Sequence, residues 1–287
     1  MKSIYLFSSY FENQKLPYYV EVYLLELRKH FSELVFISND KPLSPESLSF
    51  LSENKMQYFP VKNEGFDFGM WSKAFANYPI ENYERIALVN DSCVLFAPLQ
   101  NFFNWANQSN LDYCAISESQ AISYHLQSYF LVLNNKAALL AKQYFNQIGI
   151  LPDIKQVIEK YEVGLSTFML SKGMKLGAFV SNNGYAGEYS PYYHLLESHL
   201  QQGVPMMKKK IVYASYRKDE LFTLLRMNFK IEPEYYFNLI QSQQKQALLI
   251  DFNQLNMDMP RALSKFQIKI YNLKRKAFHS LKKLLGK

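Results

Sequence analysis

The chain has 287 residues, 48% of them hydrophobic and 16% aromatic, so it can bury a large core, and this composition excludes a disordered protein. Nine of its 32 Lys and Arg residues and none of its 25 Asp and Glu residues lie between Arg261 and Lys287. Residues 1–260 therefore have a net charge of −2 and lack the basic surface that nucleic-acid binding requires. The two cysteines lie in apolar runs, and no run is long enough for a signal peptide or a membrane span, which favours a reduced, cytoplasmic compartment and a soluble or peripheral protein.

The first 96 residues alternate between strand and helix patterns. We predict strands at Ser3 to Ser9, Glu33 to Ser38, Met56 to Val61 and Arg85 to Phe96, and helices at Leu16 to Phe31, Ser44 to Asn54 and Gly69 to Tyr78. This alternation predicts an α/β fold with a mostly parallel central sheet flanked by helices. Such sheets bind ligands beyond the carboxyl ends of their strands, so polar residues that follow strands are candidates for a site.

Beyond residue 96 the order of elements changes. We predict strands at Asp112 to Ser117, Tyr124 to Leu133 and Lys175 to Val180, and helices at Lys136 to Ile148, Ile154 to Lys172 and Asp219 to Asn256. Pro260 separates the last helix from the basic end of the chain. The predicted organisation is a catalytic domain over residues 1–215, a helical extension over 216–260 that packs on it, and a C-terminal basic helix over 261–287.

The segment Asn63 to Gly69 follows a predicted strand and opens a helix. Gly65 and Gly69 let the backbone approach a ligand, the helix start offers N–H groups to phosphate, and the Asp67 carboxylate can hold sugar or ribose hydroxyls. We therefore assign Asn63, Gly65, Asp67 and Gly69 to the binding of a donor substrate that carries phosphate and sugar groups. The alternative is an ordinary turn in which Asp67 caps the helix.

The segment Asn90-Asp91-Ser92 lies at the end of the hydrophobic strand pattern Ile86 to Val89. Oxygen ligands at this position suit Mg or Mn, so Asp91 is a candidate metal ligand, and all three residues are candidates for donor binding. A single carboxylate makes a weak metal site. The alternative is an Asp91 that is hydrogen-bonded within a turn.

Polar residues alternate through the apolar segment Tyr124 to Phe130. In a strand this alternation places His125, Gln127 and Tyr129 on one face, as a shelf with hydrogen-bonding and stacking groups for a sugar. We assign these three residues and Ser128 to acceptor binding. The alternative is a structural, buried histidine.

Three further residues are candidates for the chemistry. Glu162, in the segment Glu-Val-Gly-Leu-Ser, is the candidate general base, and the alternative is an exposed helix residue. Lys208, which begins a run of lysines, can offset the charge of a departing nucleoside diphosphate, and the alternative is a solvated lysine run. We also assign His194 to the acceptor site.

Taken together and in this order, five segments resemble the rhamnan synthesis protein F family of polysaccharide glycosyltransferases. The segments are Asn63 to Gly69, Asn90 to Ser92, His125 to Phe130, Glu162 to Ser166 and Gly203 to Lys208, and the resemblance covers about residues 1–215. It implies a GT-A-like nucleotide-sugar-binding fold, a nucleotide-activated donor, and assembly of rhamnose-containing or related surface glycans. It also implies that Asp91 takes the place of the metal-binding acidic motif, although the second aspartate is absent here.

These features predict a hexosyltransferase that transfers a sugar, with rhamnose as one candidate, from a dTDP-, UDP- or GDP-linked donor. The predicted acceptor is a growing capsule or lipopolysaccharide glycan or a lipid-linked glycan, and the predicted chemistry is inverting. Glu162 and Asp91 are the predicted catalytic residues, and a divalent cation is the candidate cofactor. The alternative function is a non-catalytic carbohydrate-binding or assembly subunit of a polysaccharide-synthesis complex.

The C-terminal segment 261–287 has the pattern of an amphipathic helix. With 100° per residue, seven of its apolar residues fall within an arc of about 80°, and most of its basic residues fall outside that arc. These seven are Leu263, Phe266, Ile270, Leu273, Ala277, Leu281 and Leu284. This pattern predicts a helix on an anionic membrane surface, which would place the protein on the inner face of the cytoplasmic membrane. The alternative is a helix that packs its apolar stripe against the protein body.

Overall fold

The computed structural model describes residues 2–10, 14–181 and 196–209. Its core is an eight-stranded sheet in the order β3-β2-β1-β4-β8-β6-β7, with β9 paired to β6, and a small second sheet joins β10 to β5. The predicted helix at Asp219 to Asn256, the segments 216–260 and 261–287, and His194 lie outside the described residues.

The first half of the chain builds a parallel half-sheet. Its elements are β1 (Ser3–Ser9), α1 (Tyr18–Arg28), β2 (Glu33–Asn39), α2 (Pro45–Glu53), β3 (Gln57–Val61), α3 (Phe66–Asn77), η1 (Ile80–Asn82, a 3₁₀ helix) and β4 (Arg85–Asn90). Strands β3, β2, β1 and β4 all run parallel. Local sequence sets the start of helix α2: the Ser44 side chain caps it by accepting from the Ser47 backbone amide at 3.3 Å, and Pro45 occupies the first helical position.

The second half adds antiparallel pairs. Its elements are β5 (Cys93–Leu95), α4 (Gln100–Gln108), β6 (Tyr113–Ser119), β7 (His125–Leu126), β8 (Phe130–Asn134), α5 (Asn135–Ile148), α6 (Ile154–Val157), η2 (Ile158–Val163, a π-helix), α7 (Gly164–Ser171), β9 (Leu176–Val180), α9 (Leu196–Gln201) and β10 (Met206–Lys208). Strand β8 runs antiparallel to both β4 and β6, whereas β9 runs parallel to β6.

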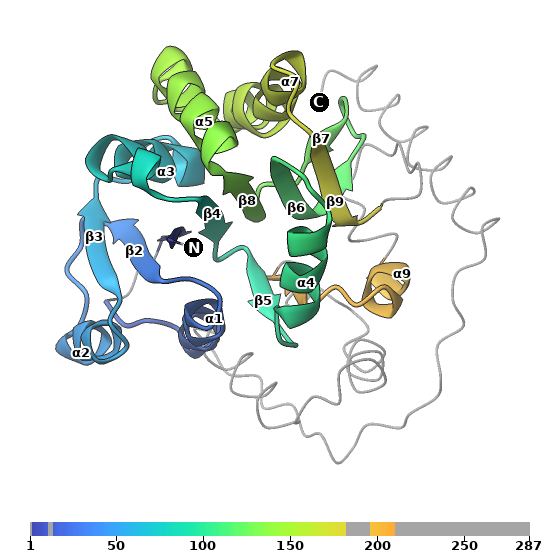
Figure 1. Ribbon diagram of the computed structural model, residues 1–287. Coiled ribbons are helices and arrows are strands. Elements are labelled where there is room, and N and C mark those ends of the chain that lie inside the picture. Colours follow the sequence, from blue (N-terminus) through green and yellow to red (C-terminus); the bar gives the residue numbers. More distant parts are fainter. Residues whose placement is uncertain (1, 11–13, 182–195, 210–287) are drawn as a thin grey trace, which may run out of the picture.

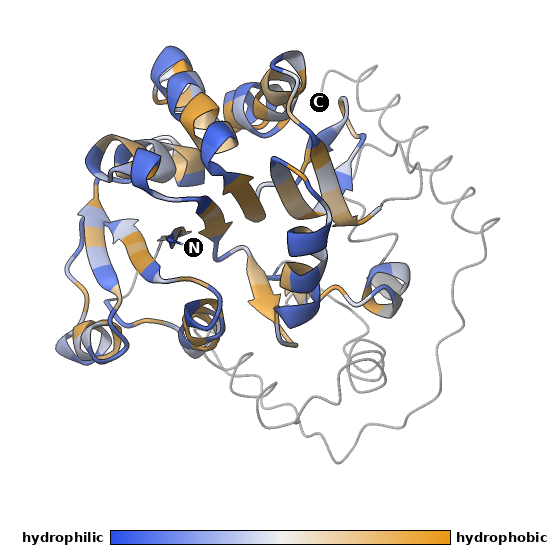
Figure 2. Ribbon diagram, viewed as in Figure 1, coloured by the Kyte–Doolittle hydropathy of each residue, from blue (hydrophilic) through white to orange (hydrophobic). Residues whose placement is uncertain are grey.

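The sheet is covered on both faces (Figure 1). Helices α3, α5 and α7 pack on one face, and α1, α2 and α4 pack on the other. Strand β1 shows why: Ile4 and Leu6 belong to the first of these cores, whereas Tyr5 and Phe7 belong to the second. The strands at the centre of the sheet are accordingly apolar along most of their length, as Figure 2 shows. The predicted α/β class, with a mostly parallel central sheet flanked by helices, is confirmed.

Two predicted strands are wrong because each is broken by a polar turn. The predicted strand Arg85 to Phe96 ends at Asn90, and the chain resumes as β5, which pairs with β10 instead of the main sheet. The predicted strand Tyr124 to Leu133 is likewise split into β7 and β8. Helix α4 and the short elements α9 and β10 were not predicted. The predicted helix Ile154 to Lys172 is present, but its middle turns are π-helical.

Every helix in the described ranges is too short or too polar to span a bilayer.

Candidate active site

The carboxyl ends of β1 and β4 meet the start of α3 at one side chain, Asp67. Ser8 and Asn90, which are register partners on the two strands, both donate to it. The Ser8 hydroxyl lies 3.2 Å from Asp67 Oδ1, and the Asn90 amide nitrogen lies 2.8 Å from Asp67 Oδ2. Three segments that are far apart in the sequence are therefore joined at the edge of the sheet where a ligand is expected.

The backbone of the loop before α3 requires glycine at two positions. Gly65 has a φ of 76°, and a Cβ on Gly69 would lie 1.8 Å from the carbonyl oxygen of Glu64. Both glycines are therefore required by the turn itself, whether or not a ligand approaches them. Asp67 does not cap this helix, because Gly65 is at the N-cap position and no side chain caps it. The Asp67 carboxylate is directed to the strand ends instead, and Asn63 is exposed on the same loop.

Burial raises the pKa of Asp67 from 3.8 to about 7, and the negative charge of Asp91 adds to the rise. The hydrogen bond from Ser8 and the charge of Lys208 act in the opposite direction. At neutral pH this carboxyl therefore exists in both the protonated and the ionised form. A carboxyl of this kind beside the ends of two strands is typical of a functional site.

Asp91 lies in the turn between β4 and β5 and carries an ion pair. Its Oδ2 lies 2.8 Å from Lys209 Nζ and 2.9 Å from the Tyr19 hydroxyl. The turn is fixed at both ends, since the Ser92 amide donates to Asn90 Oδ1 at 3.1 Å and the Ser92 carbonyl accepts from the Lys209 amide at 2.8 Å. Helix α1 and the segment after β10 therefore both contribute to the site.

Lys208 also reaches this edge, from β10. Its Nζ lies 4.8 Å from the centre of the Tyr129 ring. Strand β10 pairs with β5, and Lys208 lies opposite Cys93. Burial raises the pKa of the Cys93 thiol to about 11, so the predicted buried thiol is confirmed and the group is not a nucleophile at neutral pH.

The predicted shelf of His125, Gln127 and Tyr129 is not formed as one exposed face. All three side chains are buried, and the strand ends at Leu126 before the alternation is complete. The hydroxyl of Ser117 donates to Gln127 Oε1 at 3.0 Å and accepts from the Tyr129 hydroxyl at 3.0 Å. These residues therefore support the wall behind the site, and Ser128 is the more exposed member of the segment.

Glu162 contacts the candidate acceptor segment directly. Its Oε1 accepts from both the amide and the hydroxyl of Ser128, each at 3.2 Å. One turn later, the Ser166 hydroxyl accepts from the Leu126 amide at 3.1 Å. The π-helix η2 and helix α7 thus hold the connection between β7 and β8. Because the backbone N–H of Asn90 donates to the Tyr129 carbonyl at 3.2 Å, this connection also lies against the end of β4.

The structure therefore brings together half of the predicted site residues. Asp67, Asn90, Asp91, Ser92 and Lys208 lie at one edge, and Ser128 and Glu162 adjoin it through Tyr129. Sequence reasoning missed Ser8, Tyr19 and Lys209. Ser8 follows the rule applied to the other strand ends, so it could have been found, whereas nothing in the sequence singles out Tyr19 on its helix.

The described residues do not suit the divalent cation expected at Asp91. No group of three or more His, Cys, Asp or Glu side chains among them could hold a metal ion. The one Asp91 oxygen with contacts is already occupied by an ammonium and a hydroxyl. Such a donor set lacks the several oxygen ligands that Mg and Mn prefer.

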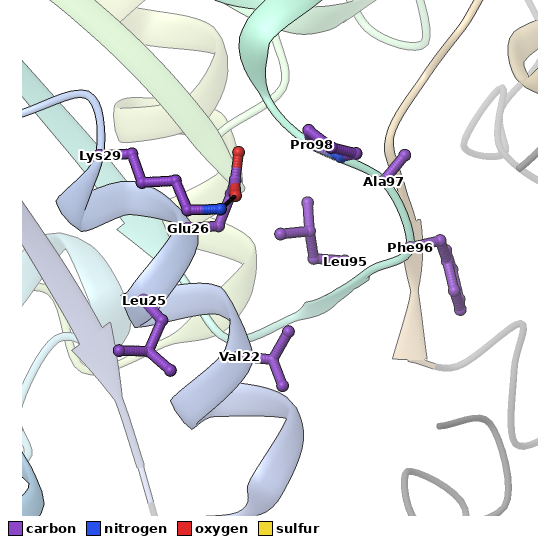
Figure 3. A pocket seen from close by; sticks show the side chains of 8 residues that line it. All are labelled: Val22, Leu25, Glu26, Lys29, Leu95, Phe96, Ala97 and Pro98. Carbon is purple, nitrogen blue, oxygen red and sulfur yellow. Dashed lines mark hydrogen bonds and ion pairs between the residues drawn. The ribbon is translucent and has the colours of Figure 1, made fainter. Parts of the chain in front are cut away.

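A separate pocket of about 290 Å³ lies between α1 and the chain that follows β5 (Figure 3). It is lined by Val22, Leu25, Glu26, Lys29, Leu95, Phe96, Ala97 and Pro98. Its two charged residues pair with each other, with Lys29 Nζ 2.7 Å from Glu26 Oε2. Glu26 Oε1 accepts from the Leu99 amide at 2.9 Å. None of the predicted site residues lines this pocket, and its charged groups are already paired.

Comparison with known proteins gives one family. Residues 34–280 match the family model described as Rhamnan synthesis protein F. The match begins later than the resemblance placed at residues 1–215 and extends past it into the basic segment. No curated protein matches the chain.

Several solved structures are similar at low identity. A protein described as a glucose-1-phosphate thymidylyltransferase, from Bacillus anthracis and in complex with sucrose, has 9% identity and a TM-score of 0.44, covering 61% of this chain and 86% of that one. A 4-diphosphocytidyl-2C-methyl-D-erythritol synthase from Anaerococcus prevotii has 11% identity and a TM-score of 0.40, covering 70% and 99%. The glycosyltransferase GlyE from Streptococcus pneumoniae has 13% identity and a TM-score of 0.38, covering 84% and 64%.

Proposed function

This chain belongs to the rhamnan synthesis protein F family, and from that premise we propose that it is a glycosyltransferase that uses a nucleotide-sugar donor to extend a surface polysaccharide. The observation that carries the proposal is the convergence of Asp67, Asp91 and Lys208 at the carboxyl ends of β1 and β4. Carboxylates can hold the hydroxyls of a nucleotide sugar, and lysine can hold its phosphates. The GT-A-like fold implied by the family places its donor at the same kind of edge.

The proposed reaction is an inverting transfer. The acceptor hydroxyl oxygen bonds to the anomeric carbon while the bond from that carbon to the phosphate oxygen breaks. The hydroxyl proton passes to Glu162, and the nucleoside diphosphate leaves with the electron pair of the broken bond. Lys208 offsets the negative charge that develops on the leaving group.

The geometry of Glu162 supports its role as the base. Its Oε1 takes both hydrogen bonds from Ser128, and no described residue hydrogen-bonds to Oε2. One oxygen therefore orients the carboxylate, while the other is available to a proton. Ser128 is in turn the candidate residue that positions the acceptor.

The test is a donor-turnover assay with UDP-, dTDP- and GDP-sugars, in which the released nucleoside diphosphate is measured without and with oligosaccharide acceptors. We expect slow hydrolysis of one donor class by the protein alone, because transferases lose some sugar to water. Release should increase with a suitable acceptor. If no donor is hydrolysed and none binds, the chain is instead a non-catalytic assembly subunit.

The proposed partners also include an anionic membrane surface, reached through residues 261–287. This segment lies outside the described residues, and the support is its charge and apolar pattern alone. Each basic residue near an anionic leaflet is worth about 1 kcal/mol, so a few of the nine suffice to hold the enzyme beside a lipid-linked acceptor. The full chain should co-sediment with anionic vesicles at low salt, and a chain ending at residue 260 should not. Equal sedimentation of the two would contradict this placement.

A further inference from the structure

Lys209 is held at Asp91 by contacts from two other parts of the chain, helix α1 and the turn between β4 and β5. Its Nζ lies 2.8 Å from Asp91 Oδ2 and 2.9 Å from the Tyr19 hydroxyl. The same ammonium lies 5.1 Å from the centre of the Tyr19 ring, and the Lys209 amide donates to the Ser92 carbonyl. Only 22% of the Lys209 side chain is exposed. The ammonium is therefore positioned by the fold before any ligand binds.

This arrangement places a cation where an acidic motif would otherwise hold a metal. Asp91 Oδ2 accepts from both Lys209 and Tyr19. A divalent ion at this oxygen would have to displace the ammonium or lie within a few ångströms of it, where two like charges repel. The ion pair thus neutralises Asp91 and competes with a metal for it.

The neighbouring lysine completes the balance of charge. Lys208 acts on Asp67 electrostatically, as Lys209 does on Asp91. The edge therefore carries two ammonium groups and two carboxyl groups, of which Lys209 and Asp91 form an ion pair. An incoming diphosphate therefore meets no net negative charge at this edge. At other acidic sites the carboxylates would repel the diphosphate, and a bound divalent cation removes that repulsion.

We infer that Lys209 is a built-in counter-ion for Asp91 and that the site binds a nucleoside diphosphate group without a divalent cation. Lys208 then contacts the phosphates, while the Lys209 ammonium offsets the negative charge of the Asp91 carboxylate. This inference rests on the proposed function, because it concerns the same donor site.

The first test compares metal-free and metal-containing buffer. UDP, dTDP and GDP are each titrated against the full chain by calorimetry and by thermal shift, once in EDTA and once with MnCl₂ or MgCl₂. At least one of them should bind in EDTA with a dissociation constant within about twofold of its value with metal. Binding that appears only with metal overturns the inference and leaves the proposed function intact. Absence of binding in both buffers overturns both.

The second test removes the ammonium and keeps its apolar stem. For Lys209→Met, the dissociation constant in EDTA should rise by about tenfold or more. Mn²⁺ should then recover part of the affinity, because the Asp91 carboxylate is open to it. Unchanged binding in EDTA would overturn the inference.

A matched control is Lys172→Met, which removes another lysine that lies over an aromatic ring. Its Nζ is 5.4 Å from the centre of the Phe168 ring, and it follows α7, away from the site. This variant should bind as the original chain does. Circular dichroism reports whether Lys209→Met is folded. If it is not, the comparison of buffers with the unaltered chain decides the inference alone.

Discussion

Replacing Asp67 by Asn should remove the pH dependence of stability that this carboxyl imposes. Its pKa is about 7 in the folded chain, against 3.8 as the ordinary value. Below about pH 4 both the folded and the unfolded chain hold the proton. As the pH rises toward 7 the unfolded chain releases it first, so the free energy of unfolding falls, and above 7 the loss is constant.

The magnitude follows from the shift in pKa. A shift of roughly 3 units corresponds to about 4 kcal/mol, of which about 3 kcal/mol falls between pH 5 and pH 8. Asn does not titrate, but it can accept only one of the two hydrogen bonds that Ser8 and Asn90 donate, which costs about 1 kcal/mol. The Asn variant should therefore be about as stable as the original chain at pH 5 and more stable by about 3 kcal/mol at pH 8.

The measurement is urea unfolding followed by tryptophan fluorescence at several pH values, with the two chains compared at each. The difference between them isolates Asp67 from the other titrating groups. Asp40→Asn, at an exposed aspartate, is the matched control for the removal of a carboxylate. Parallel curves for the Asp67→Asn chain and the original would refute the assignment of a raised pKa.

Two further substitutions test the site and its supporting turn. Glu162→Gln keeps an oxygen for the Ser128 hydrogen bonds but cannot take a proton, so transfer should fall about a hundredfold with donor binding retained, whereas Glu159→Gln on the exposed side of the same π-helix should be neutral. Equal loss of donor affinity would instead assign Glu162 to positioning. Gly69→Ala should destabilise the chain by about 3 kcal/mol or more, because its Cβ would meet backbone. Gly177→Ala, whose Cβ meets only a leucine side chain, should cost clearly less in the same urea titration.

The main sheet was predictable because its strands are buried on both faces. Runs such as Ser3–Ser9 and Glu33–Asn39 are apolar and of strand length, and turn or capping residues such as Ser44 flank them. The break at Asn90 was not predicted because the residues on both sides are equally apolar and buried. The turn residues Asn-Asp-Ser were the signal that could have indicated it.

The candidate site was predictable only as far as strand ends reveal it. Asn90 and Asp91 were found because they follow an apolar run, Asp67 was found because its segment follows a predicted strand and opens a helix, and Ser8 lies at a strand end in the same way. Lys209 could not be distinguished from its neighbours in the lysine run, since its role depends on the pairing of β10 with β5. That pairing joins segments more than 100 residues apart, as the separation of Lys209 and Asp91 shows.

The π-helix has a consequence for the lengths that this stretch of chain can take. A π turn contains more residues than an α turn, so it acts as an insertion ahead of α7. Deleting one residue there would restore an α turn and leave the helices on its two sides in about the same relative orientation. Ser166, in α7, should then still accept from the Leu126 amide, whereas Glu162 lies within the turn that changes and should lose its hydrogen bonds to Ser128. The extra residue of η2 thus serves to place Glu162 against Ser128, and a relative shortened by one residue there would have to hold its acceptor loop in another way.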